Sequence, residues 1–197
     1  MQQPAAIGIR VHSGWGALVA VAGKGASVEV VDRRRVEIIN PRTPGAAQPY
    51  HFAERLEVNK AQEHVMRCAV VSKGLALAAL QQVAGQLQSR GYQVAGITIL
   101  LSSGRPLPAF ERILAAHALI HAAEGEFFRQ AFRDAAEELK IPVTGIRERG
   151  LEVELKSALG AAAPGLQKRV AGFRSVLGPP WTADQKLAAL AAAITLA

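Results

Sequence analysis

The sequence predicts an α/β fold on a mixed sheet, with three antiparallel strands first and then alternating helices and parallel strands. Three observations support this fold class. Apolar and polar residues alternate with a period of two through much of residues 6–39, as in half-buried strands. Residues 92–101 and 141–146 are short apolar runs of the kind found in strands buried on both faces. The segments that follow these strands have helical periodicity.

The predicted antiparallel strands are joined by short turns that contain glycine. Residues 6–21 predict a β-hairpin around the turn Ser13-Gly14, because apolar residues recur at every second position on both sides of it. A second turn falls at residues 23–25, and residues 27–39 predict the third strand. These strands are expected to form an antiparallel meander.

The middle of the chain predicts helices around the buried strands. Residues 40–49 hold three prolines and predict a loop, after which a helix is expected over about 54–90, ending before Gly91. Residues 108–139 are helical in pattern but unusually long for one crossover helix. We therefore expect two helices there, with a break within residues 119–123.

The last part of the chain is the least regular. Residues 151–159 predict a short helix, and Thr182 with Gln185 forms a capping box that starts the final helix. We expect a single domain over residues 1–197, with an irregular helical insertion at about 150–180.

The composition indicates a chain with one hydrophobic core and limits the kinds of partner it is expected to bind. The chain has 197 residues, half of them hydrophobic, which is enough material for one core. Its formal net charge of +7 favours polyanionic partners such as nucleic acid, through phosphate neutralisation and counterion release. The basic residues are scattered along the sequence instead of being concentrated in one segment. The alternative to a polyanionic partner is therefore a protein that is basic without binding any polyanion.

Location is predicted from the cysteine count and the missing targeting signals. Cys68 is the single cysteine, so no intrachain disulfide can form, which suits a reducing compartment. It lies in an apolar stretch and is expected to be a buried thiol. Residues 1–9 lack the features of a signal peptide, and we find no run of about 18 uncharged apolar residues. We expect a cytoplasmic protein with no membrane partner.

The order of elements resembles the ribonuclease H-like superfamily. The first hairpin reads Ala-Ile-Gly-Ile-Arg-Val-His-Ser-Gly-Trp-Gly-Ala-Leu-Val-Ala-Val, from Ala6 to Val21. It is similar to the first hairpin of the Holliday-junction resolvase branch, in which a Gly-Ile-Asp start leads through a small-residue turn to an aromatic residue. The resemblance implies a ribonuclease H-like mixed sheet and a nucleic-acid partner.

The chain departs from this resemblance where the metal-binding carboxylates are expected. Nucleases of the superfamily hold two divalent metals with carboxylates from the first strand, the end of the fourth strand and the last helix. Here Arg10 stands at the first-strand position, and the fourth strand ends in Ser102 and Ser103. Asp184 remains near the start of the last helix. We therefore expect a nucleic-acid-binding relative without two-metal nuclease activity.

A histidine and carboxylate cluster is the candidate metal site. On a continuous helix His117, His121 and Glu124 share one stripe, and two imidazoles with one carboxylate could bind zinc or another divalent transition metal. The alternative is a pair of half-buried, hydrogen-bonded histidines. If the helix instead restarts near Ala123, Glu124 and Glu126 fill its first turn, where the helix dipole favours carboxylates.

Further candidates for catalysis lie at the first hairpin and after the proline-rich loop. His12 is at the hairpin tip, on the face that carries Arg10, and His51 could reach it from the loop as an acid–base partner. The full set of candidate catalytic residues is His12, His51, His117, His121 and Glu124. For each lone histidine the alternative is a surface or packing role.

Four arginines are the candidate nucleic-acid contacts: Arg10, Arg33, Arg35 and Arg105. Arg33 and Arg35 share one face of their strand, because side chains alternate along it. Arg105 directly follows a buried strand, where ligands bind in open α/β sheets. The alternative is a set of solvated charges, since no aromatic stacking platform interleaves with them in the sequence.

Three functions fit these patterns. The first is a ribonuclease H-like protein that binds nucleic acid without two-metal nuclease activity. The second is a metal-dependent or acid–base enzyme that uses the histidine and glutamate cluster. The third is a noncatalytic scaffold in which alanine-rich helices pack a homodimer.

Overall fold

A computed structural model describes residues 2–102 and 106–197. Within these residues, five strands form one sheet in the order β3-β2-β1-β4-β5. Strands β1, β2 and β3 pair antiparallel, whereas β4 pairs parallel with both β1 and β5. The strands are β1 Gln3–His12, β2 Trp15–Ala22, β3 Glu29–Glu37, β4 Tyr92–Leu101 and β5 Val143–Arg147. This is the predicted mixed sheet of three antiparallel strands followed by parallel ones.

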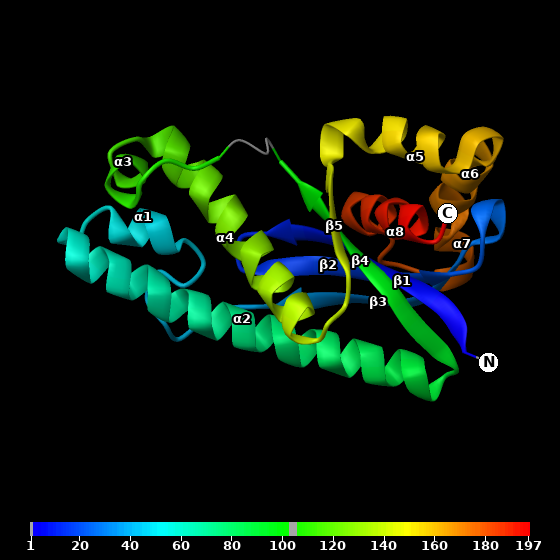
Figure 1. Ribbon diagram of the computed structural model, residues 1–197, viewed down its shortest axis with the longest axis horizontal. Helices are drawn as coiled ribbons and strands as arrows, with labels where there is room; N and C mark the ends of the chain where they lie inside the picture. Colours follow the sequence, from blue (N-terminus) through cyan, green and yellow to red (C-terminus); the bar gives the residue numbers. More distant parts are fainter. Residues whose placement is uncertain (1, 103–105) are drawn as a thin grey trace.

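Helices cover both faces of the sheet (Figure 1). Helices α2 and α4 pack on one face, and α8 packs on the other with α5 and α6 beside it. The helices are α1 Pro49–Ala53, α2 Val58–Ser89, α3 Phe110–Leu114, α4 His117–Glu138, α5 Leu151–Leu159, α6 Ala163–Gly172, α7 Arg174–Leu177 and α8 Ala183–Thr195. Short 3₁₀ turns lie at Gly25–Ser27, Glu148–Gly150 and Gly160–Ala162.

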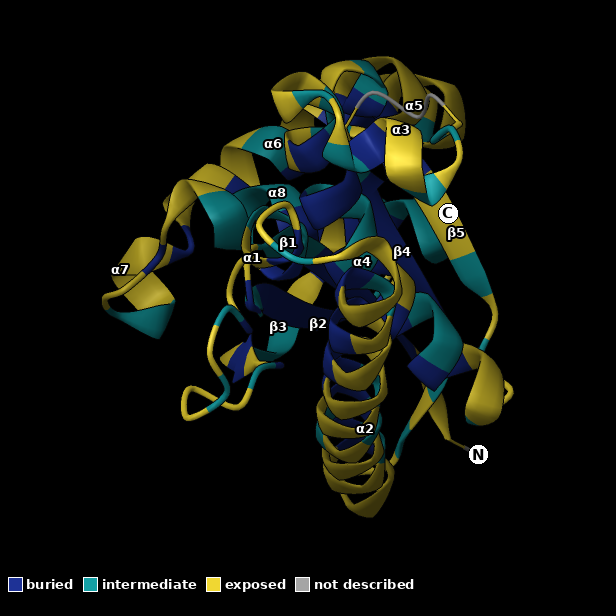
Figure 2. Ribbon diagram, turned by 90° about the vertical axis from the view of Figure 1, so that its left-hand side faces the viewer, coloured by how far each residue is buried: buried dark blue, intermediate teal, exposed yellow. Residues whose placement is uncertain are grey.

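The core lies on the two faces of the central strand β1, where side chains alternate between the helical layers. Ile7 and Ile9 pack with side chains of α2 and α4, among them Leu80 and Phe128. Ala6 packs toward the other layer, where the most buried side chains of α8 are alanines and where larger side chains of α8 pack partly buried beside them. The alanines are Ala188, Ala189, Ala191, Ala192 and Ala193, and the larger side chains are Leu187, Leu190 and Ile194. Figure 2 shows the central strands of the sheet as the buried centre of the molecule.

Helix α2 buries one stripe and exposes another. Ala76, Leu80 and Val83 lie in the core, at the three- and four-residue spacing of a single helix face. On the outer side Met66 and Val70 are exposed. By length and composition alone α2 could cross a membrane, but its buried stripe packs on the sheet and on α4. The absence of a membrane partner stays a prediction.

Two predicted helix boundaries are wrong. The helix expected over about 54–90 begins at Val58. A separate short helix, α1, comes before it, because Pro49, which was predicted to lie in a loop, is the first residue of α1. The break expected within residues 119–123 lies instead at Ala115 and Ala116, where Ala116 has extended backbone dihedrals. Helix α4 therefore runs through Gly125 without interruption, held by the core packing of its later turns.

Gly8 controls how closely α8 approaches the sheet. A side chain at Gly8 would collide with the backbone of Ala188 and Ala192 in α8. Gly8→Val should therefore lower the free energy of unfolding by at least about 3 kcal/mol in urea titrations. Gly74→Ala is the control, because Gly74 is an exposed helical position with nothing nearby, and it should stabilise by roughly 0.5–1 kcal/mol. Equal effects of the two changes would contradict this packing.

Cys68 is buried in α2, as expected, with its Sγ 3.6 Å from Nε2 of His64. Burial raises the pKa of the Cys68 thiol, so less reactive thiolate is present at a given pH than in the unfolded chain. At pH 8 the native protein should react with a thiol-specific disulfide reagent at least about 100-fold more slowly than the denatured protein. Similar rates in the two states would show that Cys68 is accessible.

Candidate nucleic-acid interface and histidine cluster

Arg10 joins three elements at the end of β1. Its Nε and Nη2 each donate a hydrogen bond of 3.0 Å to a different carboxylate oxygen of Glu148, in the turn after β5. Its Nη1 donates to Oδ1 of Asp184, in the first turn of α8. One guanidinium thus holds two carboxylates from separate elements, and we call this group the arginine clamp.

The arginine clamp is half-buried and electrostatically matched. The hydrogen bond to Glu148, followed by that to Asp184, raises the pKa of Arg10 against the opposing effect of burial. The side chains of Arg10, Glu148 and Asp184 are 26%, 40% and 21% exposed. The fixed positive charge therefore occupies a position between two acidic groups that would otherwise repel each other.

The clamp does not fit the two-metal centre that the superfamily implies. Asp184 and Glu148 are carboxylates that could bind a hard cation, but both oxygens of Glu148 and Oδ1 of Asp184 already accept hydrogen bonds from Arg10. The guanidinium would also repel a divalent ion at this position. At the end of β4, Ser102 accepts a hydrogen bond from the buried Arg129, whose Nε also donates to Oε2 of Glu126 at 3.0 Å. A second arginine–carboxylate pair therefore lies next to this strand end.

An aromatic stack lies beside the clamp. The ring of His12 stacks on Trp15 with centroids 4.2 Å apart and planes 12° from parallel. Arg35 lies over the Trp15 ring, with its Cζ 3.6 Å from a ring centroid. Nε2 of His12 also lies 3.3 Å from Oδ2 of Asp184, which connects the stack to the clamp. The sequence analysis found no aromatic platform among the arginines, because this stack forms across strands and not along one strand.

The other predicted nucleic-acid contacts have different surroundings. The guanidinium of Arg33 donates to backbone carbonyls of Leu177, Gly178 and Pro180, so it anchors the segment after α7. Arg105 lies outside the described residues. Arg35, 55% exposed and paired with Glu37, is the most accessible of the predicted arginines that the structure describes.

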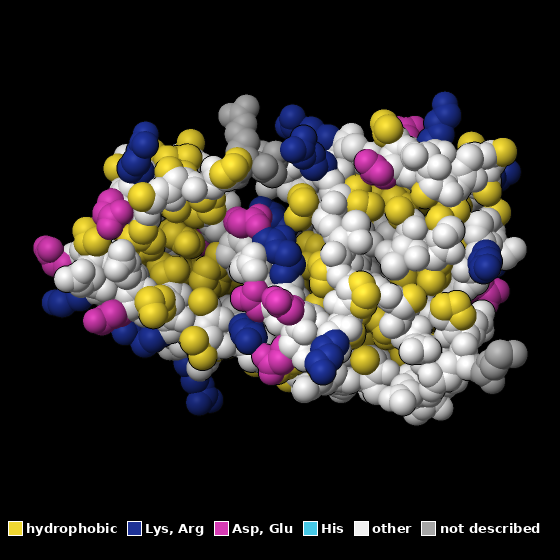
Figure 3. Space-filling view, viewed as in Figure 1, with side chains coloured by type: hydrophobic (Ala, Val, Ile, Leu, Met, Phe, Trp, Pro, Cys, Tyr) yellow, Lys and Arg dark blue, Asp and Glu magenta, His cyan; other side chains and the backbone are white. Residues whose placement is uncertain are grey.

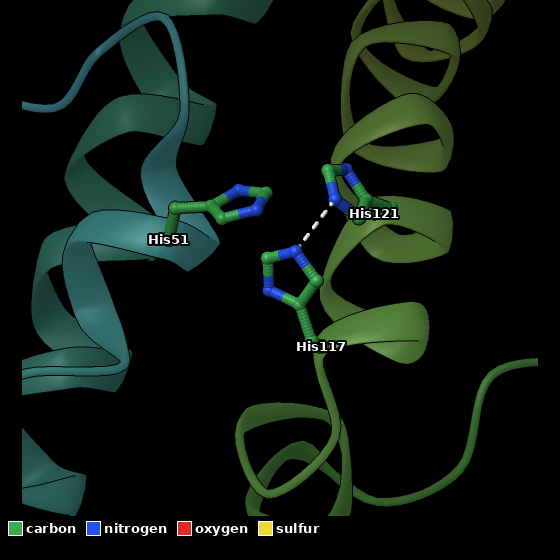
Figure 4. A group of neighbouring side chains, drawn as sticks. All are labelled: His51, His117 and His121. Carbon is green, nitrogen blue, oxygen red and sulfur yellow. Dashed lines mark hydrogen bonds between the residues drawn. The ribbon is translucent and has the colours of Figure 1, made fainter.

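The second polar centre consists of three histidines between α1 and α4. His117 and His121 lie one turn apart on α4, with their Nε2 atoms 3.0 Å apart, and His51 faces them from α1 (Figure 4). Ring nitrogens of the three residues all lie within 4.8 Å of one another. His12 and His51 contact different residues, and no hydrogen bond joins them in the described chain.

Glu124 lies behind His51, with its side chain turned inward. Its Oε1 accepts hydrogen bonds from the backbone N–H groups of Tyr50 (2.8 Å) and His51 (3.0 Å), and lies 3.2 Å from His51 Nδ1. Its Oε2 is buried with no hydrogen-bond partner among the described residues. Burial raises the pKa of Glu124, and the hydrogen bonds from His51 and Tyr50 oppose that shift.

The structure thus changes the membership of the predicted cluster. His117 and His121 are paired on a continuous α4, as the shared stripe predicts. Glu124 contacts α1 instead of the two rings of α4, and His51 completes the group. Helical spacing could not identify His51, because its position depends on how α1 packs against α4.

The sequence matches no protein-family model, and the search of curated proteins found no significant match. The structure is similar to that of RuvC from T. thermophilus in complex with a Holliday junction substrate, with a TM-score of 0.54 and 17% sequence identity. The similarity covers 96% of this chain and 91% of that one. This chain has a ribonuclease H-like fold.

A second structure of RuvC from Thermus thermophilus has a TM-score of 0.51 and 18% sequence identity over the same shares of the two chains. The ribonuclease H-like fold and the likeness to the resolvase branch, both predicted from the element order and the first hairpin, are therefore confirmed. In this ribonuclease H-like chain, the carboxyl end of β1 carries the arginine clamp.

The clamp predicts a measurable coupling between its members. In a double-mutant cycle of Arg10→Met and Glu148→Gln, urea unfolding should give a coupling energy of about 1 kcal/mol, because the bond is bidentate and only part-exposed. The matched control is the pair Arg35–Glu37, both 55% exposed, whose coupling should be roughly 0–0.5 kcal/mol. A coupling at Arg10–Glu148 no larger than this control would contradict the clamp.

Proposed function

We propose that this ribonuclease H-like chain binds nucleic acid at the carboxyl end of β1 and does not cleave it by a two-metal reaction. The observation that carries the proposal is that the guanidinium of Arg10 lies between Glu148 and Asp184. Arg10 stands at the first-strand position where the resemblance implies a metal-binding carboxylate. The net charge of +7 and the structural likeness to a RuvC–junction complex support the nucleic-acid partner.

The proposed contact surface is the aromatic stack and the arginines next to it. Trp15 offers a ring face on which a base can stack, and Arg35 offers an exposed guanidinium for a phosphate. Arg147 and Arg149 are exposed on either side of Glu148, at the carboxyl end of β5. Because β1, β4 and β5 are parallel, these groups belong to one edge of the sheet.

The surface of helices α1 to α4 that Figure 3 shows is a weaker candidate for nucleic acid. Figure 3 shows hydrophobic side chains gathered over the region of helices α1 to α4, and Lys and Arg scattered among Asp and Glu. No continuous basic surface is visible on this face of the described chain. We therefore assign the binding surface to the sheet edge near Trp15.

The homodimer and the cytoplasmic location stay predictions. The scaffold hypothesis used alanine-rich helices to pack a homodimer, but five alanines of α8 are buried inside the chain's own core: Ala188, Ala189, Ala191, Ala192 and Ala193. A second copy would have to use another surface, and the exposed apolar side chains Met66, Val70, Val71 and Leu75 all lie on α2.

The test is fluorescence anisotropy with a labelled four-way junction, a duplex and a single strand at two salt concentrations. Binding should weaken steeply with salt, as phosphate contacts require. Trp15→Ala should weaken binding by about 5-fold to 100-fold through loss of base stacking, and Arg35→Gln should reduce the salt slope by about 1. No cleavage should occur in Mg²⁺ or Mn²⁺.

The matched control is Arg67→Gln, which removes one exposed positive charge from α2 and should change binding little. If Arg67→Gln and Arg35→Gln reduced the affinity for nucleic acid equally, the positive charge of the protein would act without a defined binding surface. Absence of binding at low salt would overturn the nucleic-acid partner. Metal-dependent cleavage would overturn the role assigned to Arg10.

A further inference from the structure

We propose that His51, His117 and His121 bind one divalent transition metal ion, with Glu124 orienting His51 from behind. This site lies between α1 and α4, and its members differ from those of the arginine clamp. The inference is independent of nucleic-acid binding, because it rests on the geometry of the histidines and of Glu124.

The three imidazoles have the spacing that a single ion needs. Two nitrogens bound to one tetrahedral zinc at about 2.0–2.1 Å lie roughly 3.3 Å from each other. The Nε2 atoms of His117 and His121 are 3.0 Å apart, and nitrogens of all three residues lie within 4.8 Å. A small inward movement of His51 therefore completes a three-nitrogen site.

Glu124 supplies an independent reason to expect a cation here. Metal-binding histidines commonly donate their second ring N–H to a carboxylate, which fixes the ring and its tautomer. Nδ1 of His51 lies 3.2 Å from Oε1 of Glu124, so a hydrogen bond from the Nδ1–H group to this oxygen orients the ring and leaves Nε2 free to bind metal.

The carboxylate of Glu124 is also poorly compensated without a cation. Its side chain is 5% exposed, and Oε2 has no partner among the residues the structure describes. The structure records no ion pair between Glu124 and any described Lys or Arg. A buried carboxyl oxygen without a hydrogen-bond partner is costly, and a divalent ion held by His51 would place positive charge near it.

The donor set and the exposure indicate the class of ion. Three neutral imidazoles suit zinc and other late first-row metals more than magnesium or calcium, which prefer oxygen. His117 and His121 are exposed, so a fourth position on the ion would be open to water. Such an arrangement resembles the open coordination of catalytic zinc sites more than a closed structural site.

The experiment uses the full chain without a histidine tag, freed of metal by a chelator and titrated with Co²⁺. One Co²⁺ per chain should bind and give the visible absorption of a low-symmetry site with nitrogen ligands, and Zn²⁺ should displace it. The same titration on His51→Ala, His117→Ala and His121→Ala should show affinity reduced by at least about 100-fold. His12→Ala is the matched control and should bind Co²⁺ as the unchanged protein does.

The variant Glu124→Gln tests whether Glu124 orients His51 without binding the metal ion itself. It should retain one Co²⁺ per chain with affinity reduced about 10-fold to 100-fold, because His51 would lose its fixed orientation. Circular dichroism checks that each variant is folded. If Glu124→Gln does not fold, the variants at the exposed His117 and His121 still decide the question.

Three results would overturn the proposal: no Co²⁺ binding, binding that survives His121→Ala unchanged, or equal loss in His12→Ala. The DNA anisotropy of the metal-free protein is measured in parallel. Unchanged DNA binding in the metal-free protein and in His121→Ala keeps the metal site separate from the nucleic-acid interface. Failure of either proposal therefore leaves the other one testable.

Discussion

The bidentate pairing of Arg10 with Glu148, extended to Asp184, is the interaction on which the rest of the structure depends. It joins the central strand β1 to the turn after β5 and to the start of α8. These elements are far apart in the chain, so the clamp fixes the geometry at this end of the sheet. It also places a permanent cation between two acidic groups.

The clamp depends in turn on close packing between α8 and the sheet. Gly8 lets the backbone of α8 approach β1, and alanines of α8 are buried in the same core cluster as Ala6 of β1. The capping box of Thr182 and Gln185 then fixes the first turn, in which Asp184 reaches Arg10. Small residues in two elements thus determine the position of one carboxylate.

Much of the fold was predictable because its signals are local. Period-two alternation and the apolar run over Tyr92–Leu101 predicted the sheet, and the capping box predicted the start of α8. The break before His117 was missed, because no proline or glycine marks it and the packing of α3 decides it. Pro49 was treated as part of a loop, although it starts α1.

The sites were less predictable, because they join residues that only the tertiary structure brings together. Glu148 was not recognised as a partner of Arg10, since it follows a strand much later in the chain. The hydrogen-bond partners of Arg33 could not be predicted from the sequence either, because they are backbone carbonyls at the end of α7 and just after it. His117 and His121 were found from helical spacing, whereas His51 joined them only through the contact between α1 and α4.

The central claim is that Arg10 takes the place of a metal ion at the end of β1. Anomalous diffraction from crystals of the protein grown in Mn²⁺ tests this most directly. The account predicts a guanidinium between Glu148 and Asp184 with no anomalous peak at that position, whatever binds at the histidines. A Mn²⁺ peak between those two carboxylates, with Arg10 displaced, would contradict it.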